Sequence, residues 1–330
     1  MSDNTVGLLG IGAYLPSRIM ENEEWTQYVD TTDEWIVSRT GIQRRRVAAD
    51  DETTVTLAVK AAEVALARAG VAASDLAEII IATDTPEVTS PDTAAFVQHH
   101  LGAREIPSYD LAGSGCAGFV QALDVARARV LLGRDPVLVV GVELITRRIS
   151  WHDRNTAVLF GDGAGAAVVT RSPGVRRILG ATAGTDGSQA HILGLEVGGS
   201  RRPFSLEEAQ RGGHKEVVMN GKEVFREAVA RMSAASREVL EQTGLSIEDV
   251  DLVVPHQANL RIVQAVARTL DVPWEKMICN VQEYGNIGSA SIPVALWEAE
   301  SAGRIGPGAT VLLASFGAGF HWAAMVLRWP

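Results

Sequence analysis

The stretch Leu111-Ala112-Gly113-Ser114-Gly115-Cys116-Ala117-Gly118-Phe119 joins a short apolar segment, residues 106–111, to a helical run, residues 119–132. A thiol at a strand-to-helix turn lies next to the amide-rich N-terminus of the helix, which favours the thiolate. The glycines permit a tight turn and allow a substrate carbonyl to approach the backbone. The pattern therefore indicates a nucleophile at Cys116. For any single thiol the alternative is a buried, inert cysteine.

Two further stretches carry polar groups at the ends of apolar segments. His256 follows a strand in Val253-Val254-Pro255-His256-Gln257-Ala258-Asn259-Leu260-Arg261, and Asn286 lies in the small-residue turn Tyr284-Gly285-Asn286-Ile287-Gly288-Ser289-Ala290-Ser291. A histidine can exchange a proton or donate a hydrogen bond, and an asparagine amide can stabilise an oxyanion. Taken singly, these are also compatible with a core histidine and a turn asparagine. Together with Cys116 they predict one catalytic site.

The chain repeats a unit made of a helix followed by an apolar strand. The matching pairs are residues 59–69 with 79–81, 224–242 with 252–254, 119–132 with 137–140, and 292–302 with 311–313. Nearly continuous apolar strands that alternate with helices are typical of parallel α/β layers buried on both faces. We therefore interpret the chain as two duplicated halves, residues 1–173 with the cysteine and residues 174–330 with the histidine and asparagine. Residues 184–213 lack periodicity, and we expect them to cover the entrance to the site.

Composition limits the class of protein. The chain has 330 residues, 46% of them hydrophobic and 21% charged, which is typical of a globular protein with a substantial core. The net charge of -10 argues against nucleic acid as a partner. The two cysteines form neither a disulfide framework nor a metal site, and we expect no metal. With no signal peptide and no apolar stretch long enough for a membrane span, we expect a cytoplasmic protein.

The sequence resembles the β-ketoacyl-acyl carrier protein synthase III family of the thiolase superfamily over essentially its whole length. The matching stretches are residues 10–16, 32–42, 160–166, 254–261 and 315–320. The resemblance implies a five-layered α/β/α/β/α thiolase-like fold. It also implies a decarboxylative Claisen condensation that initiates fatty acid synthesis, in which an acyl-CoA acylates Cys116 and malonyl-acyl carrier protein loses carbon dioxide. His256 and Asn286 would stabilise the enolate.

The resemblance assigns further residues. The backbone amides of Cys116 and Ala318 would form an oxyanion hole, although most relatives have glycine where Ala318 stands. The coenzyme A contacts would be Trp35 on the adenine, Arg39 and Arg154 on the nucleotide and its phosphates, and Asn259 on the pantetheine arm. Coenzyme A enters as part of the substrate, and no separate cofactor is expected. Lys222 stands where relatives carry asparagine, so that position is not counted.

The remaining implications concern partners and primer length. Arg226, Arg261 and Arg268 match a basic patch that docks the acidic carrier protein, which would raise the association rate. A homodimer is expected from the family. Ser90 stands where acetyl-selective relatives place a bulky aromatic residue across the dimer interface. The small side chain predicts a deeper acyl pocket and a longer or branched primer.

Two alternatives use the same residues. One is a sibling enzyme with another product, either a ketide synthase of secondary metabolism or an acyltransferase to an alcohol or amine. The presence of both His256 and Asn286 favours carbon–carbon bond formation, because simple acyl transfer involves no enolate. The other is a non-catalytic acyl-binding protein on the same fold, which the presence of Cys116 disfavours.

Overall fold

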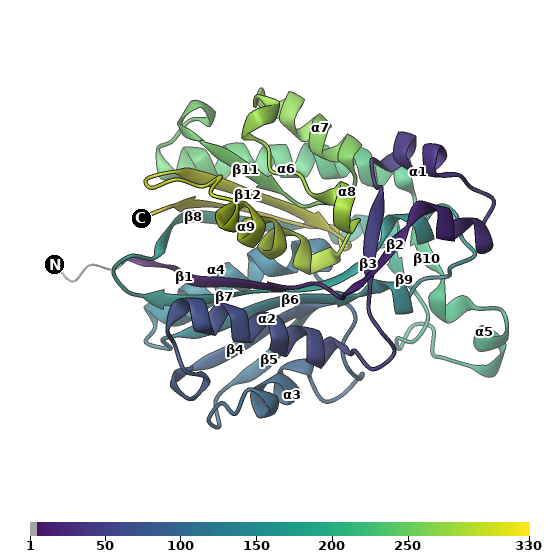
Figure 1. Cartoon of the computed structure of the whole chain (residues 1–330), viewed down its shortest axis with the longest axis horizontal. Helices are drawn as coiled ribbons and strands as arrows, with labels where there is room; N and C mark the ends of the chain where they lie inside the picture. The colour runs from purple at the N-terminus through teal and green to yellow at the C-terminus, as the bar shows by residue number, and fades with distance from the viewer. Residues whose placement is uncertain (1–4) are drawn as a thin grey trace.

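The computed structural model describes residues 5–330, and its main feature is a long twisted sheet (Figure 1). Within these residues the sheet has nine strands in the spatial order β11-β12-β13-β8-β1-β7-β6-β4-β5. Their bounds are β1 Val6–Tyr14, β4 Glu78–Thr83, β5 Ser108–Ala112, β6 Val137–Leu144, β7 Asp162–Arg171, β8 Arg176–Thr185, β11 Leu252–Pro255, β12 Thr310–Gly317 and β13 His321–Arg328.

The strand order shows the duplication. In the first half the order is β5-β4-β6-β7-β1, and in the second half it is β11-β12-β13-β8. The parallel pair β4 and β6 corresponds to the parallel pair β11 and β12, and antiparallel β7 corresponds to antiparallel β13. The counterpart of β5 is reduced to one parallel bridge between Val253 and Met277. The halves thus have the same topology, as the repeated sequence pattern predicts.

The two halves meet where β1 pairs with β8 over two residues, Gly7 with Arg177 and Leu8 with Arg176. A Cβ atom added at Gly7 would lie 2.2 Å from the Arg176 carbonyl oxygen, so a glycine is required for this close approach. The connection between β7 and β8 contains the predicted join. The largest core cluster contains residues from both halves. The division into residues 1–173 and 174–330 therefore marks the two copies of a repeat, and whether the copies are separate domains stays a prediction.

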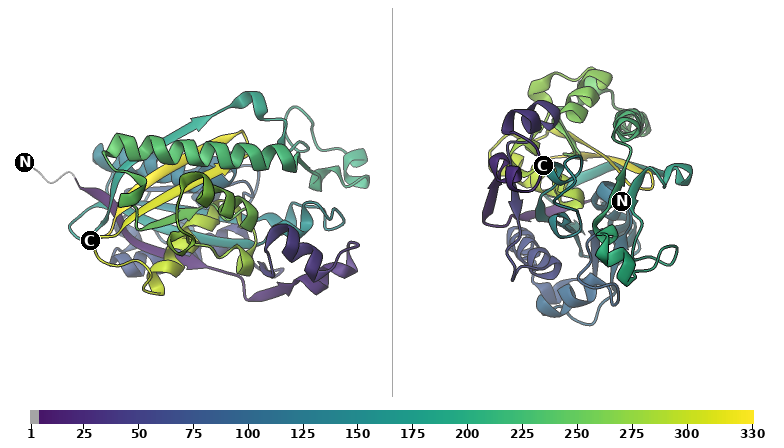
Figure 2. Two further views of the ribbon diagram at one scale, coloured as in Figure 1. Left: turned by 90° about the horizontal axis from the view of Figure 1, so that it is seen from above. Right: turned by 90° about the vertical axis from the view of Figure 1, so that its right-hand side faces the viewer.

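Six helices complete the layers. The outer face of the first half carries α2 and α3, the outer face of the second half carries α6 and α7, and α4 and α9 lie between the two parts of the sheet (Figures 1 and 2). This is the predicted α/β/α/β/α arrangement. Their bounds are α2 Thr54–Ala69, α3 Thr93–His100, α4 Gly118–Leu131, α6 Gly221–Thr243, α7 Leu260–Leu270 and α9 Ser291–Ser301.

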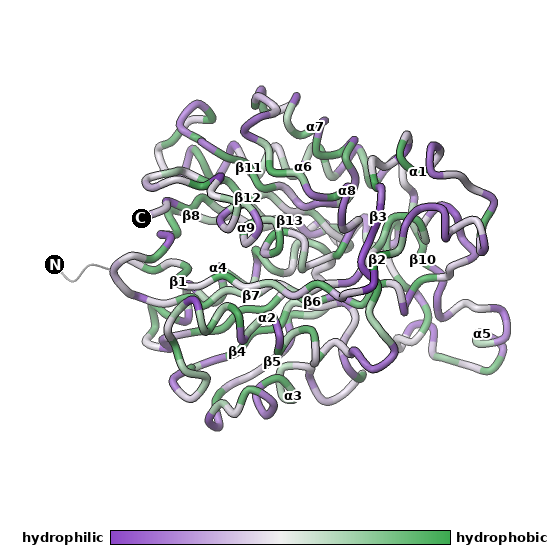
Figure 3. Tube along the Cα trace, viewed as in Figure 1, coloured by the Kyte–Doolittle hydropathy of each residue, from purple (hydrophilic) through white to green (hydrophobic). Residues whose placement is uncertain are grey.

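Local sequence explains where the equivalent helices α2 and α6 begin and end. Thr53 and Asn220 cap their N-termini by accepting backbone N–H groups, and both helices end at a glycine in the left-handed conformation, Gly70 at φ 64° and Gly244 at φ 68°. Strands β4, β6 and β12 are buried along their whole length, as their continuous apolar sequence predicts. Figure 3 shows hydrophobic residues concentrated on these layers and hydrophilic ones at the periphery.

Smaller elements surround one end of the sheet. Helix α1 is capped by Thr32 and ends at Gly41. The insertion 184–213 contains β9, which pairs with the following β10 in a two-stranded antiparallel hairpin. Within residues 5–330, no helix is both long and apolar enough to cross a membrane. The bounds of these elements are β2 Arg18–Glu21, α1 Asp33–Thr40, β3 Arg44–Val47, β9 Leu193–Leu195, α5 Leu206–Gln210, β10 Val217–Met219 and α8 Val281–Tyr284.

Candidate active site

Cys116 lies in a 3-10 turn, Gly115–Ala117, between β5 and the first residue of α4. Gly115 has φ 53°, and a Cβ atom there would lie 2.5 Å from the backbone nitrogen of Ala318. A Cβ atom at Gly317 would lie 2.4 Å from the backbone nitrogen of Cys116. The end of β12 therefore packs backbone to backbone against the cysteine turn, and both glycines are sterically required.

His256 follows β11 and is held by two hydrogen bonds. Its backbone nitrogen donates to the Ala314 carbonyl oxygen at 2.8 Å, and its Nδ1 lies 2.7 Å from the Ser291 hydroxyl. Burial lowers the pKa of His256 to about 3, so the imidazole is neutral at neutral pH. The ring lines the same cavity as Cys116, and its Nε2 has no hydrogen-bond partner within residues 5–330. A donor or acceptor at Nε2 is thus available to a ligand.

Asn286 is fixed by its backbone and by its side-chain oxygen. Its backbone nitrogen donates to the Leu159 carbonyl at 2.8 Å, and its Oδ1 accepts from the backbone nitrogen of Gly288 at 2.9 Å. The Cys116 thiol also donates to Oδ1, at 3.8 Å. Because Oδ1 is engaged, the amide is oriented with Nδ2 free of partners in the described chain. The structure therefore brings Cys116, His256 and Asn286 to one cavity.

The thiol itself differs from the expectation. Burial raises the pKa of the Cys116 thiol well above its ordinary value, and the nearby carboxyl groups of Asp84 and Glu143 act in the same direction. Burial therefore opposes the thiolate in the unliganded site, against the direction in which the helix N-terminus was expected to act.

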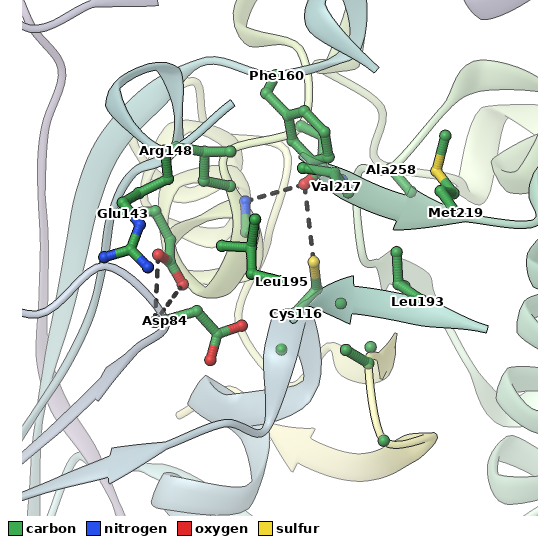
Figure 4. A pocket seen from close by; sticks show the side chains of 18 of the residues that line it. Asp84, Cys116, Glu143, Arg148, Phe160, Leu193, Leu195, Val217, Met219 and Ala258 are labelled. Carbon is green, nitrogen blue, oxygen red and sulfur yellow. Dashed lines mark hydrogen bonds between the residues drawn. The ribbon is translucent and has the colours of Figure 1, made fainter. Parts of the chain in front are cut away.

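The cavity has a volume of about 790 Å³, within the range of small-molecule sites. Figure 4 shows Asp84, Glu143 and Arg148 on one side of Cys116, and the side chains of Leu193 and Met219 on the other. The apolar wall comes from the β9–β10 hairpin and from α6, and residues of the insertion line it, as expected. Its further members include Leu195, Val217, Val224, Phe225 and Met232.

Ala318 lines the cavity beside the cysteine turn. Within residues 5–330, Asp271 is the one non-glycine residue with a positive φ, so Ala318 adopts an ordinary conformation. The replacement of the usual glycine by alanine thus carries no backbone penalty. The assignment of the Ala318 amide to an oxyanion hole stays a prediction that this geometry supports.

The predicted coenzyme A residues form two groups. Asn259 lines the cavity and caps α7, where its Oδ1 accepts from the Arg261 backbone nitrogen at 2.8 Å. Trp35, on α1, has the guanidinium carbon of Arg39 at 5.8 Å and that of Arg154 at 4.7 Å from its ring centroid. Trp35, Arg39 and Arg154 lie outside the cavity lining, and their nucleotide contacts remain predictions.

The predicted docking and specificity residues are exposed. Arg226 forms ion pairs with Glu223 at 3.0 Å and with Glu227 at 3.2 Å, and these carboxylates partly neutralise its positive charge. Arg261 and Arg268, both on α7, make no ion pair within the described part of the chain. Ser90 does not line the cavity of the single chain, whereas Thr89 does. Because the prediction places Ser90 across a dimer interface, it stays a prediction.

Sequence reasoning missed Asp84, Glu143 and the role of Ser291. Asp84 directly follows β4 and Glu143 is the penultimate residue of β6. Ligands of parallel α/β sheets bind outside the carboxyl ends of the strands, so polar residues at these two strand ends were the available signal. Within residues 5–330, no three His, Cys, Asp or Glu side chains are grouped so that they could hold a metal ion.

Comparison with known proteins agrees with this geometry. Residues 109–187 match the model of 3-oxoacyl-[acyl-carrier-protein] synthase III, and residues 240–329 match that of its C-terminal part. The chain is 45% identical to the β-ketoacyl-[acyl-carrier-protein] synthase III of Oleidesulfovibrio alaskensis, over 97% of this chain and 98% of the relative.

Two solved structures are similar throughout. The β-ketoacyl-[acyl carrier protein] synthase III of Thermus thermophilus is 47% identical, with a TM-score of 0.90 over 98% of this chain and 99% of that one. The priming β-ketosynthase from the R1128 polyketide biosynthetic pathway is 37% identical, with a TM-score of 0.90 over 99% of this chain and 96% of that one.

The chain has two repeated α/β halves, and a cysteine of the first half shares a cavity with a histidine and an asparagine of the second. These features define an acyl-transferring enzyme of the thiolase-like fold. The chain belongs to the β-ketoacyl-[acyl-carrier-protein] synthase III family.

Proposed function

We propose that the chain catalyses the decarboxylative Claisen condensation of an acyl-CoA primer with malonyl-acyl carrier protein, giving 3-oxoacyl-acyl carrier protein and initiating fatty acid synthesis. One observation carries the proposal. The Cys116 thiol, the free Nε2 of His256 and the free Nδ2 of Asn286 lie in one cavity with an apolar wall. A nucleophile and two donors for a developing oxyanion are what this reaction needs.

In the loading step the Cys116 sulfur attacks the carbonyl carbon of the acyl-CoA. The new carbon–sulfur bond forms, the bond to coenzyme A breaks, and the thiol proton ends on the departing coenzyme A sulfur. The backbone N–H groups of Cys116 and Ala318 stabilise the oxyanion of the intermediate. Because burial raises the pKa of the Cys116 thiol, the proton leaves as the substrate binds rather than beforehand.

In the condensation step the malonyl carbon–carbon bond breaks and carbon dioxide leaves. The electron pair moves to the thioester oxygen as an enolate, which accepts hydrogen bonds from Nε2–H of His256 and Nδ2–H of Asn286. In this step the Ser291 hydroxyl, 2.7 Å from Nδ1, donates to Nδ1, which leaves the imidazole proton on Nε2. The enolate carbon attacks the acyl-cysteine, and the released Cys116 sulfur takes up a proton.

The substrate carriers engage the surface beside the cavity. Trp35, Arg39, Arg154 and Asn259 bind coenzyme A, and Arg261 with Arg268 attract the acidic carrier protein more strongly than the ion-paired Arg226 does. The chemistry uses no cofactor, since coenzyme A is part of the substrate. The cytoplasm, where free thiols such as Cys116 and Cys279 persist, is the proposed location.

The proposed partner of the chain itself is a second copy. Within residues 5–330, strand β5 ends the sheet with one edge unpaired, and its residues are only partly buried while those of neighbouring β4 are fully buried. An open edge of this kind is stable when another strand or chain covers it. A homodimer through β5 would also bring Ser90 of one copy near the cavity of the other.

A second candidate function has one specific observation behind it. A priming β-ketosynthase of a polyketide pathway is among the similar structures, which fits a ketide synthase of secondary metabolism. The apolar cavity wall fits a primer longer than acetyl. Comparing the turnover of acetyl-CoA with that of octanoyl-CoA tests primer length, and clear preference for acetyl would contradict a long primer. Release of a 3-oxoacyl product from malonyl-acyl carrier protein tests condensation against simple acyl transfer.

A further inference from the structure

Two carboxyl groups that the proposed chemistry does not use lie beside the nucleophile. Asp84 follows β4, and Glu143 lies near the end of β6, the strand that runs parallel to β4 as its neighbour. Both side chains line the cavity that contains Cys116 (Figure 4). Glu143 is only 1% exposed. Burial of carboxyl groups at a reactive site needs a physical explanation, because each buried charge costs solvation free energy.

Their hydrogen bonds connect the segments that carry the catalytic groups. Asp84 Oδ1 accepts from the backbone nitrogen of Gly113 at 3.0 Å, and the carboxylate also accepts from the Gly115 amide, directly before Cys116. The two oxygens of Glu143 lie 3.1 and 3.3 Å from the Asp84 backbone nitrogen. The pair thus fixes the end of β4 to the cysteine turn.

Glu143 also contacts the turn that follows Asn286. A Cβ atom at Gly288 would lie 2.5 Å from Glu143 Cγ, so the backbone of this turn lies directly against the glutamate side chain. Gly288 is the residue whose amide orients Asn286 Oδ1. Glu143 Oε2 further accepts from the Thr85 hydroxyl at 2.8 Å. The carboxyl pair therefore lies between the cysteine turn and the asparagine turn.

The surroundings supply little compensating charge. The basic groups that face the pair are Arg148 and His321, and neither forms an ion pair with Asp84 or Glu143 in the described residues. His256, across the cavity, is neutral. Burial raises the pKa of Asp84, and burial together with the Asp84 charge raises the pKa of Glu143 to about 8. Two such carboxyl groups hold one proton between them at neutral pH.

We propose that Asp84 and Glu143 are positioning residues that share one proton, brace the Cys116 and Asn286 turns, and set how readily the Cys116 thiol ionises. This inference rests on the nucleophilic role of Cys116 in the proposed function. With one proton on the pair, one negative charge faces the sulfur. In mildly alkaline solution the second carboxyl also ionises, and its charge disfavours the Cys116 thiolate further. The rate at which Cys116 is alkylated therefore rises less steeply with pH than the rate of an isolated thiol.

The test is the pH dependence of Cys116 alkylation by iodoacetamide, followed by peptide mass spectrometry, with Cys279 in the same sample as an internal reference. At alkaline pH, where both carboxyl groups are ionised, Glu143→Gln and Asp84→Asn each remove one negative charge and keep the shape of the side chain. Each is expected to lower the midpoint of the alkylation profile by about one pH unit. The matched control is Glu78→Gln, since Glu78 is a fully buried glutamate at the opposite end of β4 and lies outside the cavity. Its midpoint should not move.

A second comparison separates charge from bracing. Asp84→Asn retains an acceptor for the Gly113 amide, whereas Asp84→Ala loses it. Both should lower the midpoint, but only the alanine variant should lower the unfolding temperature and slow the loading of acyl-CoA. Unchanged midpoints in folded Glu143→Gln and Asp84→Asn would overturn the proposal. Alkylation needs no substrate, so this failure is distinguishable from a failure of the proposed function, in which no acyl adduct forms at all.

Discussion

The Sγ atom of Cys116 and the Oδ1 atom of Asn286 lie 3.8 Å apart although 170 positions separate the two residues. The duplication explains this contact. The 3-10 turn Gly115–Ala117 precedes α4, and the equivalent 3-10 turn Gly288–Ala290 precedes α9. The two turns face each other, and the Ser289 hydroxyl donates to the Gly115 carbonyl oxygen at 3.0 Å. The repeat thus places the cysteine of one half against the asparagine turn of the other.

Removal of either oxyanion donor should separate the two chemical steps. His256→Ala and Asn286→Ala are expected to retain acylation of Cys116 but to lower the condensation rate by about 10²–10³, the usual effect of losing one donor to an oxyanion. The measurement is acyl-adduct formation by mass spectrometry beside 3-oxoacyl product formation. Equal losses in both steps would contradict the assigned roles.

Ser291 should act only through His256. Ser291→Ala removes the partner of Nδ1, so both tautomers of the ring become accessible and Nε2–H is present for part of the time. We expect condensation to fall by about tenfold, less than in His256→Ala, with loading unchanged. A variant with both changes should behave like His256→Ala alone. An additive loss in the double variant would argue against this relationship.

Stability should fall in acid partly because of His256. Its pKa is about 3 when folded and 6.5 when exposed, so below pH 6.5 the unfolded state binds more protons and the free energy of unfolding decreases until about pH 3. The contribution is up to about 1.4 kcal/mol per pH unit. Denaturant unfolding of the wild type and His256→Gln between pH 7.5 and 5.5 should therefore give a difference in free energy that shrinks as the pH falls. If the free energies of unfolding of the two proteins changed with pH in parallel, the folded state would not hold His256 as a buried, neutral histidine.

Backbone contact at the cysteine turn should make Gly317 intolerant of a side chain. Gly317→Ala would place Cβ 2.4 Å from the Cys116 nitrogen, and the other near atoms are also backbone, so neither side can yield. We expect loss of acylation by at least 10²-fold or loss of folding. Gly306→Ala is the control, because nothing lies within 4 Å of its added Cβ atom. Equal activity of the two variants would contradict the close packing.

Trp35 should contribute to substrate binding rather than to chemistry. Trp35→Ala is expected to raise the KM for acyl-CoA while kcat stays nearly constant, as for a contact made equally in ground and transition states. Trp274→Ala, at an exposed tryptophan that is not among the predicted coenzyme A contacts, should change neither. A lower kcat with unchanged KM would remove Trp35 from the coenzyme A site.

Much of the fold was predictable because its signals are local and repeated. Continuous apolar strands, helices that end at Gly70 and Gly244, and their equal spacing predicted the duplicated α/β halves, whereas the number of layers came from the family resemblance. The positions of Cys116, His256 and Asn286 were predictable for the same reason, since each follows a strand or lies in a turn. The burial of these side chains was not predictable, and burial opposes the Cys116 thiolate that the helix N-terminus was expected to favour.

What could not be predicted depends on contacts between distant segments. Asp84 follows β4 and Glu143 lies near the end of β6, and only the sheet order brings the two residues together. The need for glycine at position 317 likewise arises from its contact with Cys116 across the two halves.

The central claim is that Cys116 carries the acyl group that condenses with malonyl-acyl carrier protein. Intact-protein mass spectrometry after mixing with a panel of acyl-CoAs tests it most directly. The account predicts a thioester adduct that is absent in Cys116→Ala and that is discharged as a 3-oxoacyl product when malonyl-acyl carrier protein is added. An adduct that persists in Cys116→Ala, or no adduct with any acyl-CoA, would contradict it.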